Sequence, residues 1–308
     1  MGLPNLRMGI IFLIQMQVGI LENSTLLLTF IISMLSLHNH RLTDQILNQL
    51  VLANSLVLFS KGIPQTMATL GWKCFLDDTE CKLVFYLHRV GRGVSLSATC
   101  LLSSFQAIKL RSSFSRWMEL GVKSPKCVGF GCSFSWILNL LINIFIPMKV
   151  TGPLNEKNIS LEKLKDYGCC SGIMAEKFTI TLYALVYFSI DFICLGLMVW
   201  SSGSMVFVLH RHKQRIQHIH SNRLAPKTSH ETRAIHTILI LVSSYVFFYL
   251  LSSILTLCVS LIAKPSQWLV DSSVLVASCF PTFSPFVLIR NDKRVSKSLF
   301  ACWFRKPN

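Results

Sequence analysis

Seven long apolar stretches, separated by short polar connections, constrain the fold of this chain more than any other feature. They are Met8–Leu35, Ile46–Leu70, Leu83–Ile108, Cys127–Met148, Phe178–Leu209, Ala234–Ile262 and Trp268–Ile289. Each reaches the roughly 20 residues that a helix needs to cross about 30 Å of hydrocarbon. Because lipid offers no hydrogen-bond partners, each stretch must pair its own backbone groups, as a helix does. The pattern predicts an all-α membrane protein, a seven-transmembrane helix bundle.

Basic residues gather on alternate connections. The connections after the first, third and fifth stretches, with the C-terminal tail, carry eighteen Lys and Arg residues and only four acidic residues. An excess of positive charge marks the cytoplasmic side, so we expect the N-terminus outside and the C-terminus in the cytoplasm. We divide the chain into a short extracellular N-terminus (1–7), a seven-transmembrane domain (8–290) and a cytoplasmic tail (291–308) with an amphipathic helix.

Composition argues against several functional classes. Charged residues make up 14% of the chain, well below the roughly 25% typical of soluble domains. The formal charge of +16 does not indicate nucleic-acid binding, because no soluble basic domain is left to carry it. We find no phosphate-binding glycine loop, nucleophile elbow or zinc-protease motif. We therefore expect no enzyme activity, no cofactor and no metal.

A histidine string follows the fifth stretch and invites comparison with a metal site. Neither carboxylates nor cysteines accompany it at ligand spacing. The simpler interpretation is a basic extension of the fifth helix into the cytoplasm. The histidines are His210, His212, His218 and His220.

Charged residues inside the third stretch are the most unusual local feature. His88 and Arg92 are four residues apart and therefore share one helical face, with Arg89 beside them. Because a buried charge needs a partner, we hypothesise that Asp191 in the fifth stretch faces the two arginines and that the cluster forms the polar floor of a pocket. The alternative is a structural ion pair without ligand contact. Glu22 and Lys61 are also charged residues within the stretches.

Aromatic residues are frequent in the outer halves of the stretches and could line a pocket for a small apolar or amphipathic ligand. For any single residue, helix packing or an interfacial belt is the simpler interpretation. The set is Phe85, Tyr86, Tyr183, Tyr187, Phe188, Phe247, Phe248 and Tyr249. The candidate ligand pocket consists of His88, Arg89, Arg92, Tyr187, Asp191 and Tyr249.

The outer connections carry modification and cross-linking signals. Asn158-Ile159-Ser160, in the longest outer connection, is a sequon for N-glycosylation at Asn158. Four cysteines lie on the outer side, where disulfides persist, and four allow three full pairings. They are Cys74, Cys81, Cys169 and Cys170. On the inner side, Cys302 is either a palmitoylation site or a free thiol.

Five strings resemble one receptor family. CKLVFYLHRVGRGVS (Cys81–Ser95) is similar to the third-helix signature of vomeronasal type 1 receptors, a branch of the G-protein-coupled receptors that respond to pheromones. The other matching strings are LANSLVLFSKGIPQTMA (52–68), WSSGSMVFVLHRHKQRIQHIHS (200–221), HTILILVSSYVFFYLLSSIL (236–255) and CFPTFSPFVLI (279–289). One departure is Glu22-Asn23, where the family often carries Gly-Asn.

The resemblance implies a disulfide between Cys81 and Cys170 that holds the outer loop over the bundle. Cys169 is an alternative partner, and Cys74 either forms a second bridge or stays free.

The same resemblance implies a chemosensory (pheromone) receptor in the plasma membrane of vomeronasal sensory neurons. Its ligand would be a small volatile or steroid-like molecule bound within the bundle, and its partner a heterotrimeric G protein of the Gi/o class. Basic residues of the inner face would attract that protein electrostatically. They are Lys109, Arg111, Arg211, Lys213 and Arg215.

Three alternatives stay open. A transporter or channel would need a polar pathway and usually internal repeats, which we do not find. A receptor-shaped protein without signalling activity is compatible with the uninterrupted stretches. A bitter-taste receptor fits the strings in the third and seventh stretches less well.

Overall fold

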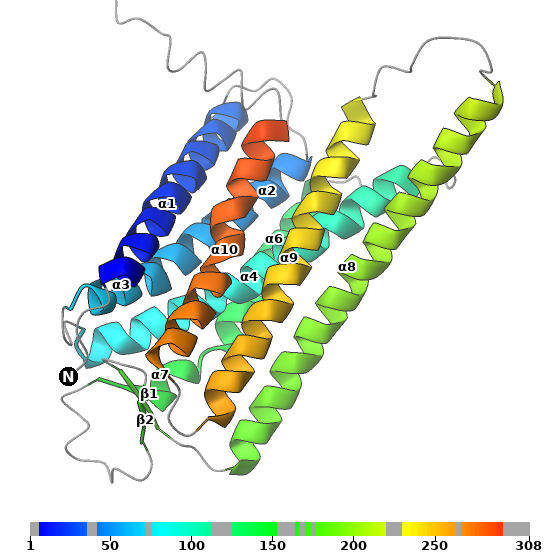
Figure 1. Cartoon of the computed structure of the whole chain (residues 1–308). Coiled ribbons are helices and arrows are strands. Elements are labelled where there is room, and N and C mark those ends of the chain that lie inside the picture. The colour runs from blue at the N-terminus through cyan, green and yellow to red at the C-terminus, as the bar shows by residue number, and fades with distance from the viewer. Residues whose placement is uncertain are drawn as a thin grey trace, which may run out of the picture.

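The chain folds into a bundle of long helices in the computed structural model (Figure 1). The structure describes residues 6–35, 42–71, 76–111, 125–152, 164–166, 170–173, 177–219, 230–262 and 266–291. Its helices are α1 (Leu6–Leu35), α2 (Leu42–Val57), α3 (Ile63–Thr69), α4 (Asp78–Arg111), α6 (Pro125–Ile142), α7 (Ile146–Lys149), α8 (Lys177–Ile219), α9 (His230–Leu261) and α10 (Gln267–Asn291). A π-helical segment, η1 (Leu58–Gly62), joins α2 to α3.

All seven predicted stretches are helical apart from short turns, so the predicted fold class is confirmed. Six helical segments among the described residues are long and apolar enough to span a membrane. The seventh, α4, has 34 residues but a more polar sequence. Several of its polar side chains, such as Ser95, Thr99 and Gln106, are buried inside the bundle and do not face lipid. The direction in which the bundle crosses the membrane stays a prediction.

Three boundaries differ from the predicted stretches. The second stretch is interrupted by η1, and the fourth helix ends at Ile142 before the short α7 begins. Helix α8 continues to Ile219, beyond the apolar stretch that ends at Leu209, as the predicted basic extension of the fifth helix requires. Apolar content marks where a helix leaves the membrane, but the polar residues that follow still form good helical turns.

A small antiparallel sheet lies at one end of the bundle, beside α7 and the start of α4 (Figure 1). It contains β1 (Val150–Thr151), β2 (Leu164–Asp166) and β3 (Ser171–Ile173) in the order β1-β3-β2. The end of α8, the start of α9 and the end of α10 lie at the opposite end. The sheet therefore belongs to the end that we predict to be extracellular.

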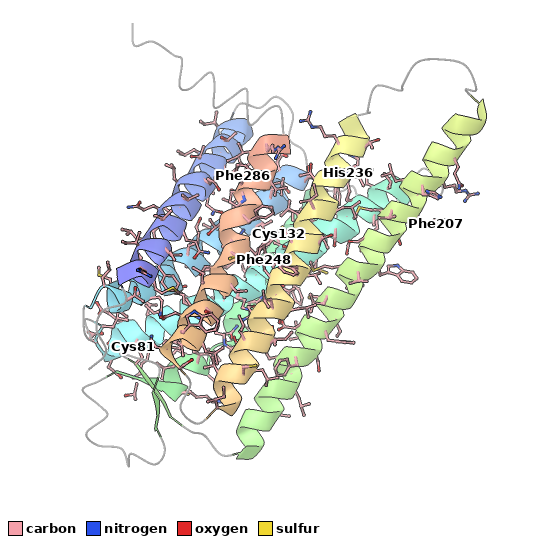
Figure 2. The ribbon with its side chains drawn as sticks, viewed as in Figure 1. Cys81, Cys132, Phe207, His236, Phe248 and Phe286 are labelled. Atoms are coloured by element: carbon pink, nitrogen blue, oxygen red, sulfur yellow. A yellow bond between two sulfur atoms is a disulfide. The ribbon has the colours of Figure 1, made fainter. Side chains whose placement is uncertain are left out.

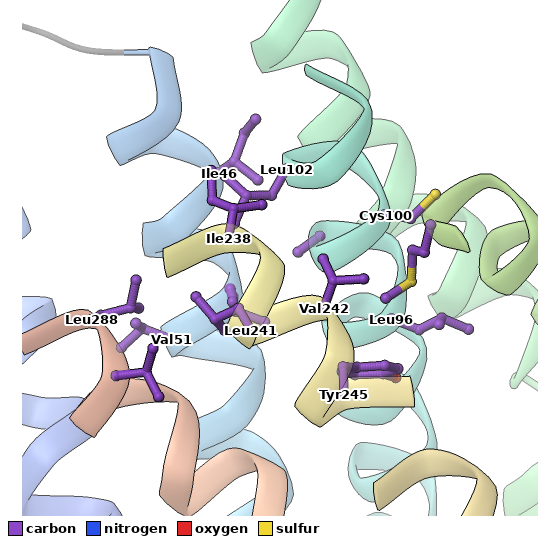
Figure 3. Close-up of a cluster of buried hydrophobic side chains, with 14 of the residues drawn as sticks. Ile46, Val51, Leu96, Cys100, Leu102, Ile238, Leu241, Val242, Tyr245 and Leu288 are labelled. Atoms are coloured by element: carbon purple, nitrogen blue, oxygen red, sulfur yellow. The ribbon is translucent and has the colours of Figure 1, made fainter. Parts of the chain in front are cut away.

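The apolar core lies inside the bundle and takes buried side chains from α1, α2, α4, α6, α8, α9 and α10. Figure 3 shows part of it, with Leu288, Val51 and Leu241 close together and Leu96 on the side of α4. Leu241 is fully buried. Large side chains on α8, such as Phe207, instead point away from the bundle (Figure 2). This distribution is expected for helices that pack on one side and face lipid on the other.

Buried amides join the helices where prolines interrupt the backbone hydrogen bonding of α10. Pro285 has no N–H group, so the carbonyl oxygen of Pro281, four residues earlier, loses its helical donor. The Asn23 amide of α1 donates to that oxygen at 3.0 Å. One turn further along, the Asn54 amide of α2 donates to the Ser284 hydroxyl at 2.9 Å. These bonds fix α10 against α1 and α2.

Close packing between α4 and α6 leads to the first prediction. A Cβ atom at Gly93 would overlap the side-chain oxygen of the buried Asn139. We expect Gly93→Ala to lower the melting temperature, because overpacking typically destabilises by about 1–3 kcal/mol. The double variant Gly93→Ala with Asn139→Ala should recover part of the loss in a thermal denaturation assay. Additive losses in the double variant would contradict this packing explanation.

Candidate functional site

A small cavity lies inside the bundle between α2, α4, α9 and α10. It is lined by Val57, His88, Arg92, Ser95, Tyr245, Phe248, Tyr249, Ser252, Ala277, Phe280 and Pro281. Its volume is about 40 Å³, enough for a few waters at roughly 10–15 Å³ each. Pockets for drug-sized ligands are about 300–1,000 Å³. A ligand of that size therefore requires the helices around this cavity to separate.

Arg92 reaches from α4 to α9. Its guanidinium carbon lies 4.7 Å from the centroid of the Tyr249 ring, which is a cation–π distance. One of its terminal nitrogens donates to the Ser253 hydroxyl at 3.3 Å. Arg92 and Tyr249 both line the cavity, so this contact forms part of its polar wall.

Arg89 reaches toward α8 instead. Its guanidinium carbon lies 4.7 Å from the centroid of the Tyr187 ring. The two arginines lie three residues apart and thus approach neighbouring helices from the same side of α4. Arg89, Tyr187 and Asp191 do not line the cavity, although the sequence grouped them with its lining residues.

Asp191 lies within electrostatic reach of both arginines, as hypothesised, but without a direct ion pair. Asp191 is buried and accepts a hydrogen bond from the Tyr249 hydroxyl. Among the described residues it forms no ion pair with Arg89 or Arg92. The Tyr249 ring lies against Arg92 while its hydroxyl reaches Asp191, so the tyrosine links the two charges. The charges that were expected to face one another are therefore connected through Tyr249.

Several aromatic residues of the predicted set lie away from the cavity. Phe188 and Phe247 are 66% and 61% exposed and face outward. Tyr86 donates from its hydroxyl to the Leu140 carbonyl at 3.2 Å, and Phe85 packs against the group around Cys81. Phe248 does line the cavity. The side chain of Tyr183 lies outside the described residues.

Two aromatic residues that line the cavity were not predicted from the sequence. Tyr245 and Phe280 meet edge to face, with ring centroids 4.6 Å apart. Tyr245 lies one helical turn before Tyr249 and stacks on it at 5.8 Å, so its four-residue spacing was a usable signal. No comparable signal marks Phe280, because it comes from a different helix.

A disulfide joins Cys81, at the start of α4, to Cys170, just before β3. This is the pairing that the family resemblance implied. Both half-cystines are buried, and Figure 2 shows Cys81 at the end of the bundle that carries the sheet. Cys74, Cys169 and the sequon residue Asn158 lie outside the described residues.

Asp78 holds the same end of the bundle together. Its carboxylate accepts hydrogen bonds from Lys82 at 2.5 Å, from the Gly152 backbone at 2.7 Å and from the Thr151 hydroxyl at 3.2 Å. The hydrogen bond from Lys82, followed by that from Gly152, lowers the pKa of Asp78 from 3.8 to about 2. The carboxylate therefore joins the start of α4 to β1.

This network predicts a pH-dependent contribution to stability. Because the folded pKa is depressed, the contribution is complete above the unfolded pKa near 4 and disappears as pH falls toward 2. We expect wild type to melt above Asp78→Asn at neutral pH and the difference to shrink between pH 4 and pH 2. Melting curves across that range measure it. A constant difference would show that the charge of Asp78 is not involved.

The end of the bundle opposite the sheet offers fewer described side chains. Lys109 and Arg211 are exposed near that end, on α4 and α8. The side chains of Arg111, Lys213 and Arg215 lie outside the described residues, as do the tail (292–308) and Cys302. Of the four histidines, His210 is described, and it contacts the Gln214 amide at 3.0 Å along α8. The described residues contain no group of three or more side chains suited to a metal.

Comparisons with known proteins agree on one family. The profile of the "Vomeronasal organ pheromone receptor family" matches residues 6–301. The chain is 53% identical to human "Vomeronasal type-1 receptor 1" over 99% of this chain and 86% of that protein. It is 48% identical to human "Vomeronasal type-1 receptor 4", over 94% and 96% of the two chains. A zebrafish (Danio rerio) protein, "Olfactory receptor class A-like protein 1", is 30% identical over 96% and 92%.

Proposed function

The chain belongs to the vomeronasal organ pheromone receptor family, a family of chemosensory receptors, and we propose that it binds a small molecule within its helix bundle and activates a heterotrimeric G protein of the Gi/o class. The chain is a multi-pass membrane protein. The proposal places it in the plasma membrane of vomeronasal sensory neurons, with the N-terminus outside. The ligand class that the family resemblance implies is a small volatile or steroid-like molecule.

The observation that carries this proposal is the cavity at the junction of four helices. Its wall combines aromatic rings with Arg92 and His88, a mixture of apolar surface and few polar groups that suits small ligands. Because the cavity is much smaller than a ligand pocket, occupation requires α9 or α10 to move relative to α4. A ligand that binds the wider arrangement more tightly shifts the population toward it.

The basic inner end supplies a docking surface in this proposal. Lys109 and Arg211 are exposed at the end opposite the sheet, and Arg111, Lys213 and Arg215 extend the same positive run in the sequence. Positive charge there steers an acidic partner surface and speeds its association. Movement of α9 would change the spacing between these groups and so couple the cavity to the G protein.

The testing experiment is a Gi/o activation assay in cells that carry the chain with a surface-labelled N-terminal tag. A panel of volatile compounds and steroid derivatives serves as probe. We expect a dose-dependent response that pertussis toxin abolishes and that Arg92→Ala weakens without loss of surface label. A response that is insensitive to the toxin would contradict Gi/o coupling. A response unchanged in Arg92→Ala would contradict this cavity as the site.

A further inference from the structure

Three cations are carried by neighbouring turns of two packed segments: Lys61 by η1, and Arg89 and Arg92 by α4. Gly91 allows α4 to approach α2 closely, since a Cβ atom there would lie 3.1 Å from the Ala53 carbonyl oxygen and from a Val57 methyl. The two helices run in opposite directions. Lys61, one turn after Val57, therefore lies at the level of the turn of α4 that precedes Gly91.

The charges at this level interact. The Lys61 ammonium lies within electrostatic reach of the Arg92 and Arg89 guanidinium groups. It also interacts with His88, which precedes Arg89 and lines the cavity. A π-helical turn contains Lys61, and such turns occur frequently at functional sites. The packing of α2 on α4 thus concentrates positive charge beside the cavity.

The carboxylates near these three cations do not neutralise them. Two buried carboxylates lie near this level, and both already accept hydrogen bonds: Asp191 from the Tyr249 hydroxyl, and Asp271 from the amide of Gln65, one turn after Lys61. Arg92 and Arg89 contact the faces of aromatic rings. No carboxylate in the described part of the chain forms an ion pair with Lys61, Arg89 or Arg92. Unpaired charge within a membrane is costly and marks functional positions.

An unpaired polar atom points to the same place. The Nδ1 atom of His88 is buried and has no hydrogen-bond partner among the residues that the structure describes. Buried polar atoms are rarely left without a partner. The cavity that His88 and Arg92 line has about 40 Å³, which is room for a small dehydrated ion or the head of a larger molecule.

We propose that Lys61, His88 and Arg92, in the field of Arg89, form an anion-binding site within the bundle. The site takes one monovalent anion, which is either a halide from solution or the anionic group of an organic molecule. The anion supplies the negative charge that the surrounding side chains lack. Its binding stabilises the packing of η1 on α4 and does not require G-protein coupling.

Thermal melting of the purified full-length protein in lipid nanodiscs tests the site, with tryptophan fluorescence as readout. Sodium chloride and sodium bromide are compared with sodium gluconate at equal ionic strength. We expect the halides to raise the melting temperature by roughly 5 °C when present near 100 times their Kd. Lys61→Met and Arg92→Met should abolish the shift. Lys126 is an exposed lysine at the start of α6, and the control variant Lys126→Met should retain the shift.

A second arm distinguishes the source of the anion. In gluconate, hexanoate is compared with hexanol, which has the same chain length without the charge. A shift with hexanoate alone, lost in Lys61→Met, assigns the site to an anionic organic ligand. A halide shift assigns it to solution ions. If Lys61→Met fails to fold, Lys61→Arg and Arg92→Lys must preserve the shift.

Two results would overturn the proposal. One is a wild-type protein whose melting temperature no anion changes. The other is a shift that persists in both methionine variants, which would place the bound anion elsewhere. Neither result depends on signalling, so failure of this site and failure of the proposed receptor function are separately visible.

Discussion

Replacing Cys81 with serine is expected to destabilise the protein by about 2–4 kcal/mol and to deplete it from the cell surface. The Cys81–Cys170 disulfide closes a loop with a sequence separation of 89 residues. Loss of so long a cross-link restores much conformational freedom to the unfolded chain. It also releases the segment before β3 from the start of α4, where both half-cystines are buried. Melting temperature and surface label measure the two effects.

Controls separate the disulfide from a general effect of losing a cysteine. Cys127 is a free, exposed cysteine of α6, so Cys127→Ser should leave both readouts nearly unchanged. Cys170→Ser should match Cys81→Ser, and the double variant should be no worse than either single one, because one bond is lost in each case. A double variant with twice the loss would contradict the assignment.

Tyr249 is expected to show the largest effect within the membrane. Its hydroxyl donates to the buried Asp191 and its ring lies under Arg92. Tyr249→Phe leaves a buried carboxylate without that donor, which typically destabilises by about 1–3 kcal/mol. Tyr249→Leu removes the ring contact as well and should lose roughly a further 0.5–2 kcal/mol. Melting of the purified protein measures both steps, and agonist potency should fall in the same order.

The matched control is Tyr245→Phe, because the Tyr245 ring makes the contact with Phe280 and stacks on Tyr249. This variant should stay close to wild type. Adding Asp191→Asn to Tyr249→Phe should soften the loss, since no buried charge then lacks a donor. If the double variant is worse than Tyr249→Phe alone, the hydroxyl does not act through Asp191.

The sequence identified several residues of the site but not the contacts between them. His88 and Arg92 stand out because charge is rare in an apolar stretch, and their four-residue spacing places both on one face. Both line the cavity. The sequence placed Asp191 opposite the arginines but could not show that Tyr249 of α9 contacts both Asp191 and Arg92, because this depends on how α9 packs against α4 and α8.

The sequence by itself determined the helices, because a membrane requires about twenty apolar residues per crossing and internal backbone hydrogen bonds. It also pointed to the family through five long strings. Tertiary structure alone decided which aromatic rings face the cavity and which, such as Phe188, face outward. It also decided that Lys61 lies level with the arginines of α4. These outcomes depend on how helices distant in sequence rotate and approach one another, and local periodicity carries no such information.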